Sequence, residues 1–429
     1  MLITKSPSEN RRGLPHFALP AEQHVPVPLP ANGFRRDSKP SSKDRLHYLD
    51  GLRGVASVAV VLWHNFLAFF PGAVMPDVPM RSSVLEKHLY RSPFSIFFAG
   101  DFAVYVFFMM SGFVISLKFF QGADSELLQK GFLRRYVRLM PAAFVTVIAA
   151  YLILSLGLMY NNQAGDIANS WWLKLNWKDV SIHFKNALSM GLYGLWFNGI
   201  PASAHFNSNL GTLAIELIGS WIIFAAILIM MKLNLSFRQR LIFHAGLIAL
   251  AFVLDRDDPH YLVFFIGMAA ADIYANGDQF YDRLTRFRYL VLLLGVWMGG
   301  MNIGNISHTI YRPLAGVCKI CDLHPLTYPW AIGSVFLVVG IMLSKSVQRV
   351  LVRPVFQMLG KYSFPLFLTH TVFLGSVTCF VFTWLHNLHL FGYAMTVAIS
   401  FFGTLPLLCL ATHGVRIVDE WAIKTSRAF

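Results

Sequence analysis

The sequence predicts an all-α, polytopic membrane helix bundle. Of its 429 residues, 55% are apolar and only 14% are charged, whereas a soluble domain carries roughly a quarter charged residues. The mean hydropathy is positive, as expected for a chain that is mostly surrounded by lipid. The formal net charge is +14, but the basic residues lie between apolar runs. We therefore interpret them as topology signals and contacts to the lipid bilayer, and nucleic acid is excluded as a partner.

The apolar residues are grouped into ten segments that could cross a membrane. A span needs about 20 residues, so the two short segments at 241–254 and 261–274 could instead form a re-entrant hairpin, which leaves eight spans. The ten segments are 52–70, 95–117, 139–158, 210–231, 241–254, 261–274, 289–304, 328–344, 363–384 and 391–413.

Basic residues flank these segments unequally. The connections on the side of the N-terminus hold 26 Lys and Arg, and those on the other side hold 9. The positive-inside rule therefore predicts that both termini are cytoplasmic. Residues 1–47 hold seven prolines and no apolar run, so we expect a disordered basic tail there. The membrane domain is predicted at 48–413, with a short cytoplasmic tail at 414–429.

The long external connection at 159–209 is rich in aromatic residues, including Trp171, Trp172, Trp177 and Trp196. Such a composition suits a segment that lies along the membrane interface. The integral membrane could be a bacterial inner membrane or a eukaryotic internal one, and the oligomeric state cannot be predicted.

Ionisable groups within spans are costly in lipid and mark functional sites. Arg53 and His64 stand eleven residues apart, which is three helical turns and about 16 Å of rise, with both side chains on nearly one face. One helix can thus offer an anion-binding group at its cytoplasmic end and a base deep inside. By spacing alone, a snorkelling arginine and a buried structural histidine explain the pair equally well.

The motifs that contain these residues resemble a known family. YLDGLRG at 48–54, followed by ten residues and His64, resembles the Arg-x10-His signature of the acyltransferase type 3 family, integral membrane enzymes that acylate carbohydrates, lipids and other hydroxylated acceptors. Further segments match in order: FFMMSGF at 107–113, RRYVRLMP at 134–141, LGTLAIE at 210–216 and LGKYSFPLFLTH at 359–370.

Two positions depart from the family pattern. Tyr105 stands where many members carry an acid, and Gly211 replaces a usual tryptophan. Asp101, one helical turn before Tyr105, could supply the missing carboxylate. Gly211 could widen a pocket, so the family's choice of acceptor is not transferable.

The resemblance implies acyl transfer from a thioester to a hydroxyl, which requires a base, an oxyanion stabiliser and a grip on the donor. His64 is the predicted base. Phosphates of an acyl-CoA cosubstrate, most simply acetyl-CoA, would be held by arginines: Arg53, with Arg134, Arg135 and Arg138 on the adjoining cytoplasmic loop.

Three further polar positions complete the predicted site. Glu216 must pair, protonate or line a wet cavity to be tolerated in its span. Ser111 lies in the packing motif beside Gly112, and His370 carries family support without an assigned role. Cys318 and Cys321 have C-x-x-C spacing, but no second such pair accompanies them, so we predict no metal site and no tightly bound cofactor.

The sequence therefore predicts a membrane O-acyltransferase that acts on a saccharide or glycolipid hydroxyl. The alternatives are acylation of a small secondary metabolite, or a non-enzymatic transporter or exporter. Counting from the span ends places His64, Asp101 and Glu216 in one layer about 9 Å below the external surface, which predicts that they share one cavity. Arg53, Ser111 and His370 would form a second layer on the cytoplasmic side.

Overall fold

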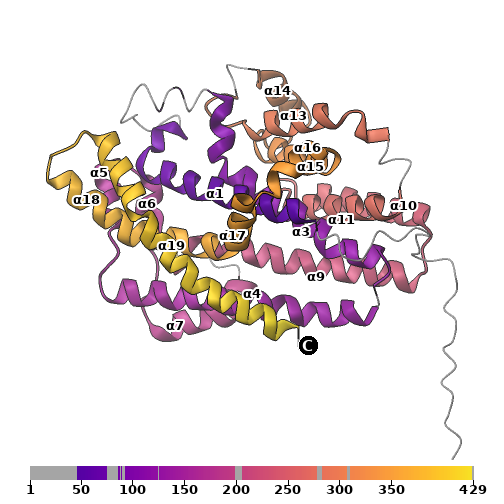
Figure 1. The fold of residues 1–429 in the computed structure, drawn as a ribbon, viewed down its shortest axis with the longest axis horizontal. Helices are drawn as coiled ribbons and strands as arrows, with labels where there is room; N and C mark the ends of the chain where they lie inside the picture. The colour runs from indigo at the N-terminus through magenta and orange to yellow at the C-terminus, as the bar shows by residue number, and fades with distance from the viewer. Residues whose placement is uncertain are drawn as a thin grey trace, which may run out of the picture.

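The computed structural model describes residues 46–74, 86, 88, 92–123, 125–198, 205–277, 283–306 and 310–427. Nearly all of the expected basic tail at 1–47 and most of the connection at 71–94 lie outside the described residues. Every regular element within the described residues is a helix, and Figure 1 shows these helices gathered into one bundle. The predicted all-α helix bundle is confirmed.

The first half of the chain forms helices from the start of the membrane domain to the middle of the bundle. Their bounds are α1 (His47–Phe69), η1 (Pro71–Ala73), η2 (Pro93–Phe98), α3 (Gly100–Phe120), α4 (Ser125–Ser155), α5 (Asn161–Ala168), α6 (Trp171–Leu175), α7 (Phe184–Ser189), η3 (Met190–Gly194), α8 (Leu195–Phe197), η5 (Ser208–Leu210) and α9 (Gly211–Lys232).

The second half adds further helices around them. Their bounds are α10 (Phe237–Leu254), α11 (His260–Asn276), α13 (Arg288–Gly299), α14 (Arg312–Ile320), α15 (Thr327–Leu343), α16 (Lys345–Leu351), α17 (Pro354–Phe373), η6 (Leu374–Thr378), α18 (Cys379–Asn387) and α19 (Tyr393–Ser426). The stretch α17–η6–α18 is one long helix that carries a π-helical turn at η6.

All ten expected apolar segments form helices, but they differ in length. Within the described residues, seven helices are long and apolar enough to cross a membrane, and α15 with α16 makes an eighth if the pair, bent by 95°, is one span. The remaining two, α11 and α13, have 17 and 12 residues. Length and composition therefore support seven or eight spans among the described residues. The set differs from the predicted fallback of eight, because it includes α10, which the fallback removed, and leaves out α13, which the fallback kept.

The centre of the bundle depends on close backbone contacts between helices. α3 packs along α11, and a Cβ atom added at Gly112 would lie 2.2 Å from the carbonyl oxygen of Phe264. A Cβ at Gly267 on the other helix would lie 2.5 Å from the carbonyl oxygen of Met109. Small residues that let backbones approach are typical of membrane helix interfaces. This is the packing role expected for Gly112.

We expect Gly112→Ala to lower the thermal stability of the detergent-purified protein. Overpacking of a tight interface costs about 1–3 kcal/mol, and here the obstacle is backbone that cannot rotate away. Gly246→Ala on α10 is the matched control, because no described residue lies within 4 Å of a Cβ there, and alanine is the better helix former. An equal melting temperature for Gly112→Ala and the wild type would contradict this packing.

The helices α4 and α19 extend beyond the apolar segments that predicted them. Arg134, Arg135 and Arg138 were expected on a cytoplasmic loop, but they lie within α4, in the stretch 128–155 that is apolar enough to span a membrane. The segment 414–426, expected in a short tail, continues α19 without a break. Figure 1 shows α19 crossing beside α4.

The described part of the connection at 159–209 forms α5 to α8, of which α5 and α6 contact α1 and α7 contacts α4. Ser170 donates from its hydroxyl to the carbonyl of Leu67 at 2.7 Å and so ties the start of α6 to α1. Trp171 is exposed, whereas Trp172, Trp177 and Trp196 are buried. Three of these four tryptophans therefore pack within the protein, although the sequence suggested that they lie along the membrane interface.

Candidate active site

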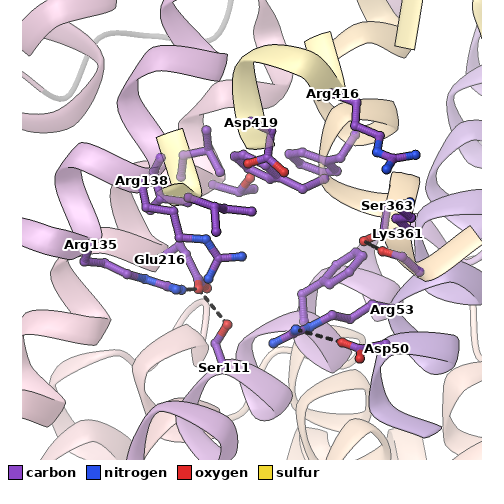
Figure 2. Close-up of a pocket in the computed structure, with 18 of the residues that line it drawn as sticks. Asp50, Arg53, Ser111, Arg135, Arg138, Glu216, Lys361, Ser363, Arg416 and Asp419 are labelled. Carbon is purple, nitrogen blue, oxygen red and sulfur yellow. Dashed lines mark hydrogen bonds and ion pairs between the residues drawn. The ribbon is translucent and has the colours of Figure 1, made fainter. Parts of the chain in front are cut away.

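A cavity of about 540 Å³ opens between the first turns of α1 and α17, the middle of α4 and the last turns of α19. Its volume is that of a typical small-molecule site. Figure 2 shows charged side chains from these helices turned toward the same space. The lining charged residues are Asp50, Arg53, Arg135, Arg138, Glu216, Lys361, Arg416, Asp419 and Glu420.

A chain of polar contacts crosses the cavity wall from α3 to α4. Ser111 donates from its hydroxyl to Oε1 of Glu216 at 2.6 Å, and Arg135 forms an ion pair with the same oxygen. Arg135 Nε also donates to the Ser220 hydroxyl at 3.1 Å. Glu216 is therefore tolerated because it pairs with a cation and lines the cavity, which were two of the three expected solutions.

The other charged groups of the wall are partly neutralised in pairs. Nη1 of Arg53 lies 3.6 Å from Oδ1 of Asp50. Arg416 binds Glu420 with Nε at 3.0 Å and lies over the ring of Tyr362. These ion pairs reduce the positive charge that Arg53 and Arg416 offer to a ligand.

Arg138 differs from the paired arginines. Its Nε is buried without a hydrogen-bond partner among the described residues, and Figure 2 shows its guanidinium turned into the cavity beside Glu216. Arg134, on the same helix, also has a buried Nε without a hydrogen-bond partner among the described residues, but it does not line the cavity. Arg135 is therefore paired, whereas Arg138 and Arg134 both have an unpartnered Nε and differ in that only Arg138 lines the cavity.

His64 is held by two acceptors on one ring nitrogen. Its Nδ1 lies 2.9 Å from the carbonyl oxygen of Val60 and 3.1 Å from Nε2 of His370. A carbonyl can only accept, so Nδ1 of His64 carries the proton in this arrangement. Nε2 is then the unprotonated nitrogen, which is the form that a general base needs.

The tautomer of His370 is fixed in the same way. Its Nδ1 lies 3.0 Å from the carbonyl oxygen of Leu366 and donates to it. Its Nε2 is therefore an acceptor, and its single lone pair is shared by the side-chain amide of Asn209 at 3.0 Å and Nδ1–H of His64 at 3.1 Å. His370 thus occupies, next to His64 Nδ1, the place that a carboxylate takes in a catalytic triad.

His64 lies behind residues of the cavity wall. The ring of Phe367, which lines the cavity, is 6.0 Å from that of His370, and the His370 ring is 5.0 Å from that of His64. Trp172 of α6 lies 5.1 Å from His64 between ring centres. The ring of His64 therefore packs against both His370 and Trp172.

Asp101 does not support the base. It is exposed and lines a separate hollow of about 20 Å³ with Trp63 and Trp330, and among the described residues no carboxylate contacts His64. The expected common cavity of His64, Asp101 and Glu216 is not found. The two expected layers are also wrong, because Ser111 and Glu216 were placed in different layers and are hydrogen-bonded.

The two departures from the family pattern have structural consequences. Tyr105 donates a hydrogen bond from its hydroxyl to the carboxylate of Asp258, and its ring stacks on that of His260 with centroids 5.1 Å apart. Among the described residues, a Cβ atom at Gly211 would come within 4 Å of His205 alone, at 3.8 Å. Gly211 itself does not line the cavity, although Thr212 and Leu213 beside it do.

A family model described as an acyltransferase domain matches residues 46–413, nearly the whole chain. The chain belongs to the acyltransferase type 3 family. It is accordingly an integral membrane acyltransferase, as its motifs predicted. No curated protein and no solved structure is significantly similar to it.

Sequence reasoning missed two residues of this candidate site. Asn209, which orients His370, lies one residue before the matching motif at 210–216 and gave no signal. Asp419 lies beyond the last apolar segment and was therefore left in the tail. Among the described residues, no group of three His, Cys, Asp or Glu side chains is placed to hold a metal ion.

Proposed function

We propose that this acyltransferase transfers an acyl group, acetyl in the simplest case, from acyl-CoA to a hydroxyl of a saccharide or glycolipid. The observation that carries the proposal is the position of His64, whose ring is separated from a cavity of donor size by the rings of His370 and Phe367. The lining of that cavity includes Arg53, Arg138 and Lys361, cations that could bind phosphate.

The transfer step follows from these groups. His64 Nε2 removes the proton of the acceptor hydroxyl while its oxygen attacks the thioester carbonyl carbon, and a new ester bond forms. The carbon–sulfur bond then breaks, and the thiolate leaves as CoA with the proton that His64 returns. The imidazolium formed in between is stabilised because its Nδ1–H points at Val60 and His370.

The donor and the acceptor would approach His64 from different sides. Phe107 and Phe367 line the cavity with rings 6.3 Å apart, and Phe367 packs against His370, so we propose that a pantetheine arm passes this pair to reach the base. The acceptor would enter beside Trp172, because aromatic rings suit sugar and lipid faces. Separate entries would let one site join a donor from one compartment to an acceptor from the other.

The proposal is tested with membranes that contain the full chain, radiolabelled acetyl-CoA, and extracts of saccharides and glycolipids as acceptors. We expect label to appear in an alkali-labile ester of a carbohydrate fraction, and membranes with His64→Ala to yield none above background. Label confined to small hydrophobic metabolites would overturn the proposed acceptor class. No transfer to any fraction from acyl-CoA would overturn the donor.

For Arg53→Lys we expect a rise in the KM for acetyl-CoA with a smaller loss of rate at saturating donor. Lysine keeps the positive charge but loses the bidentate geometry that arginine offers to phosphate. Initial rates over a range of donor concentrations measure both quantities. Equal KM values in the two proteins would mean that Arg53 serves the helix through Asp50 and does not bind the donor.

We also propose that both termini are cytoplasmic, which puts the first turns of α1 and the last turns of α19, both of which line the cavity, on the side where acyl-CoA is made. Single-cysteine variants in a cysteine-free background test this with an impermeant thiol reagent. A cysteine near residue 180 should react from outside, and one near residue 425 should react only after the membrane is permeabilised. The reverse pattern would contradict the orientation that the flanking charges predict.

A further inference from the structure

Asp419 is the buried acid of the cavity that the transfer step does not use. It lies on α19, its side chain lines the cavity, and Figure 2 shows its carboxylate facing the enclosed space. It is 6% exposed, and its Oδ1 has no hydrogen-bond partner among the described residues. A buried carboxylate oxygen without a donor is costly, so a donor from a ligand would stabilise it.

The nearby cations do not supply that donor. Arg416, one turn earlier on the same helix, gives its hydrogen bonds to Glu420. Arg138 has a coulombic interaction with Asp419, but no hydrogen bond or ion pair joins them. Asp419 therefore remains as a free acceptor among the cations of the cavity.

A free acid among cations selects a ligand of mixed character. Phosphate groups would be repelled by Asp419 and held by Arg138 and Lys361. Neutral hydroxyl or amine groups of the same ligand would donate to Asp419, and a hydrogen bond to a charged acceptor is stronger than one between neutral groups. The nucleoside end of CoA carries both kinds of group close together.

We propose that Asp419 recognises the nucleoside of the acyl donor by accepting a hydrogen bond from its adenine amine or its ribose hydroxyl. The inference rests on the proposed acyl-CoA function and makes it more specific. Donors that end in phosphopantetheine, such as the arm of an acyl carrier protein, lack the group that Asp419 binds. The C-terminal turns of α19 thus determine which class of thioester the enzyme accepts.

Equilibrium binding of radiolabelled CoA to the purified full chain tests this without an acceptor. We expect Asp419→Ala to weaken the binding of CoA by about 10- to 100-fold and to leave the binding of 4′-phosphopantetheine unchanged. Asp419→Asn, which keeps a carbonyl oxygen, should recover part of the loss. Glu126→Gln, a change at an exposed acid on α4, is the control for an altered charge, and thermal unfolding reports on the fold of each variant.

Two CoA analogues separate the possible partners of Asp419. A hypoxanthine analogue lacks the adenine amine, and a 2′-deoxy analogue lacks the ribose hydroxyl. The analogue that lacks the true partner should bind the wild type more weakly and lose nothing further with Asp419→Ala.

The remaining outcomes distinguish this inference from the proposed function. If Asp419→Ala binds CoA as tightly as the wild type, or loses CoA and phosphopantetheine equally, the nucleoside assignment is wrong while acyl-CoA stays the donor. If the wild type binds no CoA, the proposed donor fails and this inference fails with it.

Discussion

His64→Ala is expected to lower the rate of acyl transfer by roughly 10²- to 10⁴-fold, the usual contribution of a positioned general base. The loss should appear in the rate at saturating donor, because His64 does not line the cavity that we assign to CoA. Initial rates with labelled acetyl-CoA, normalised to the amount of protein in the membrane, measure it.

Two controls separate this chemistry from folding. Binding of CoA to His64→Ala should match that of the wild type, since the cavity walls are unchanged. His370→Gln should also reduce the rate, but by less, because His370 only orients and stabilises His64 through one hydrogen bond. An equally abundant His64→Ala protein that transfers at the wild-type rate would remove His64 from the mechanism.

Arg138→Gln is expected to raise the KM for acetyl-CoA by about 10- to 100-fold, because it removes a charge-assisted contact worth about 1.5–3 kcal/mol. Among the cavity arginines, Arg138 has a buried Nε without a hydrogen-bond partner in the part of the chain that the structure describes. Its donors are therefore free for phosphate. KM values from donor titrations are the measurement.

Arg134→Gln is the matched control for this change. It removes the same charge from the same helix, but at a position that does not line the cavity, so its KM should stay within about twofold of the wild type. Equal increases for the two variants would show that α4 acts through its overall charge and not through a contact to the donor.

The fold class and the helix that carries Arg53 and His64 could be predicted from the sequence. Apolar segments long enough to span a membrane gave the helix bundle, and the motif spacing placed Arg53 at the cavity and His64 three turns further along α1. These predictions needed only the period of one helix. They did not depend on how separate helices meet.

The contacts between helices could not be predicted, because depth counted from span ends carries an error of several residues at each end. Ser111 and Glu216 were placed at different depths and are hydrogen-bonded. Asp101 was placed beside His64 and lies in another hollow. The pair His64–His370 joins residues 306 positions apart, and its two positions gave no signal of proximity.

The sequence contains a signal that α19 continues beyond residue 413, but a hydropathy profile does not show it. The apolar run ends near residue 413, yet the buried positions Val415, Asp419, Ala422 and Ser426 continue at the three-to-four-residue spacing of one helical face. A search for this period would have extended the helix and placed an acid on its buried face. Hydropathy alone assigned the segment to a tail.

The central claim is that an acyl-CoA donor occupies the cavity between α1, α4, α17 and α19. Photoaffinity labelling with a CoA analogue that carries a light-activated group on its nucleoside tests it most directly, with peptide mapping of the labelled protein. The account predicts label on peptides that contain residues 135–138 or 416–423, and competition by unlabelled CoA. Competed label that maps only to α10, α13 or α14, none of which lines the cavity, would contradict it.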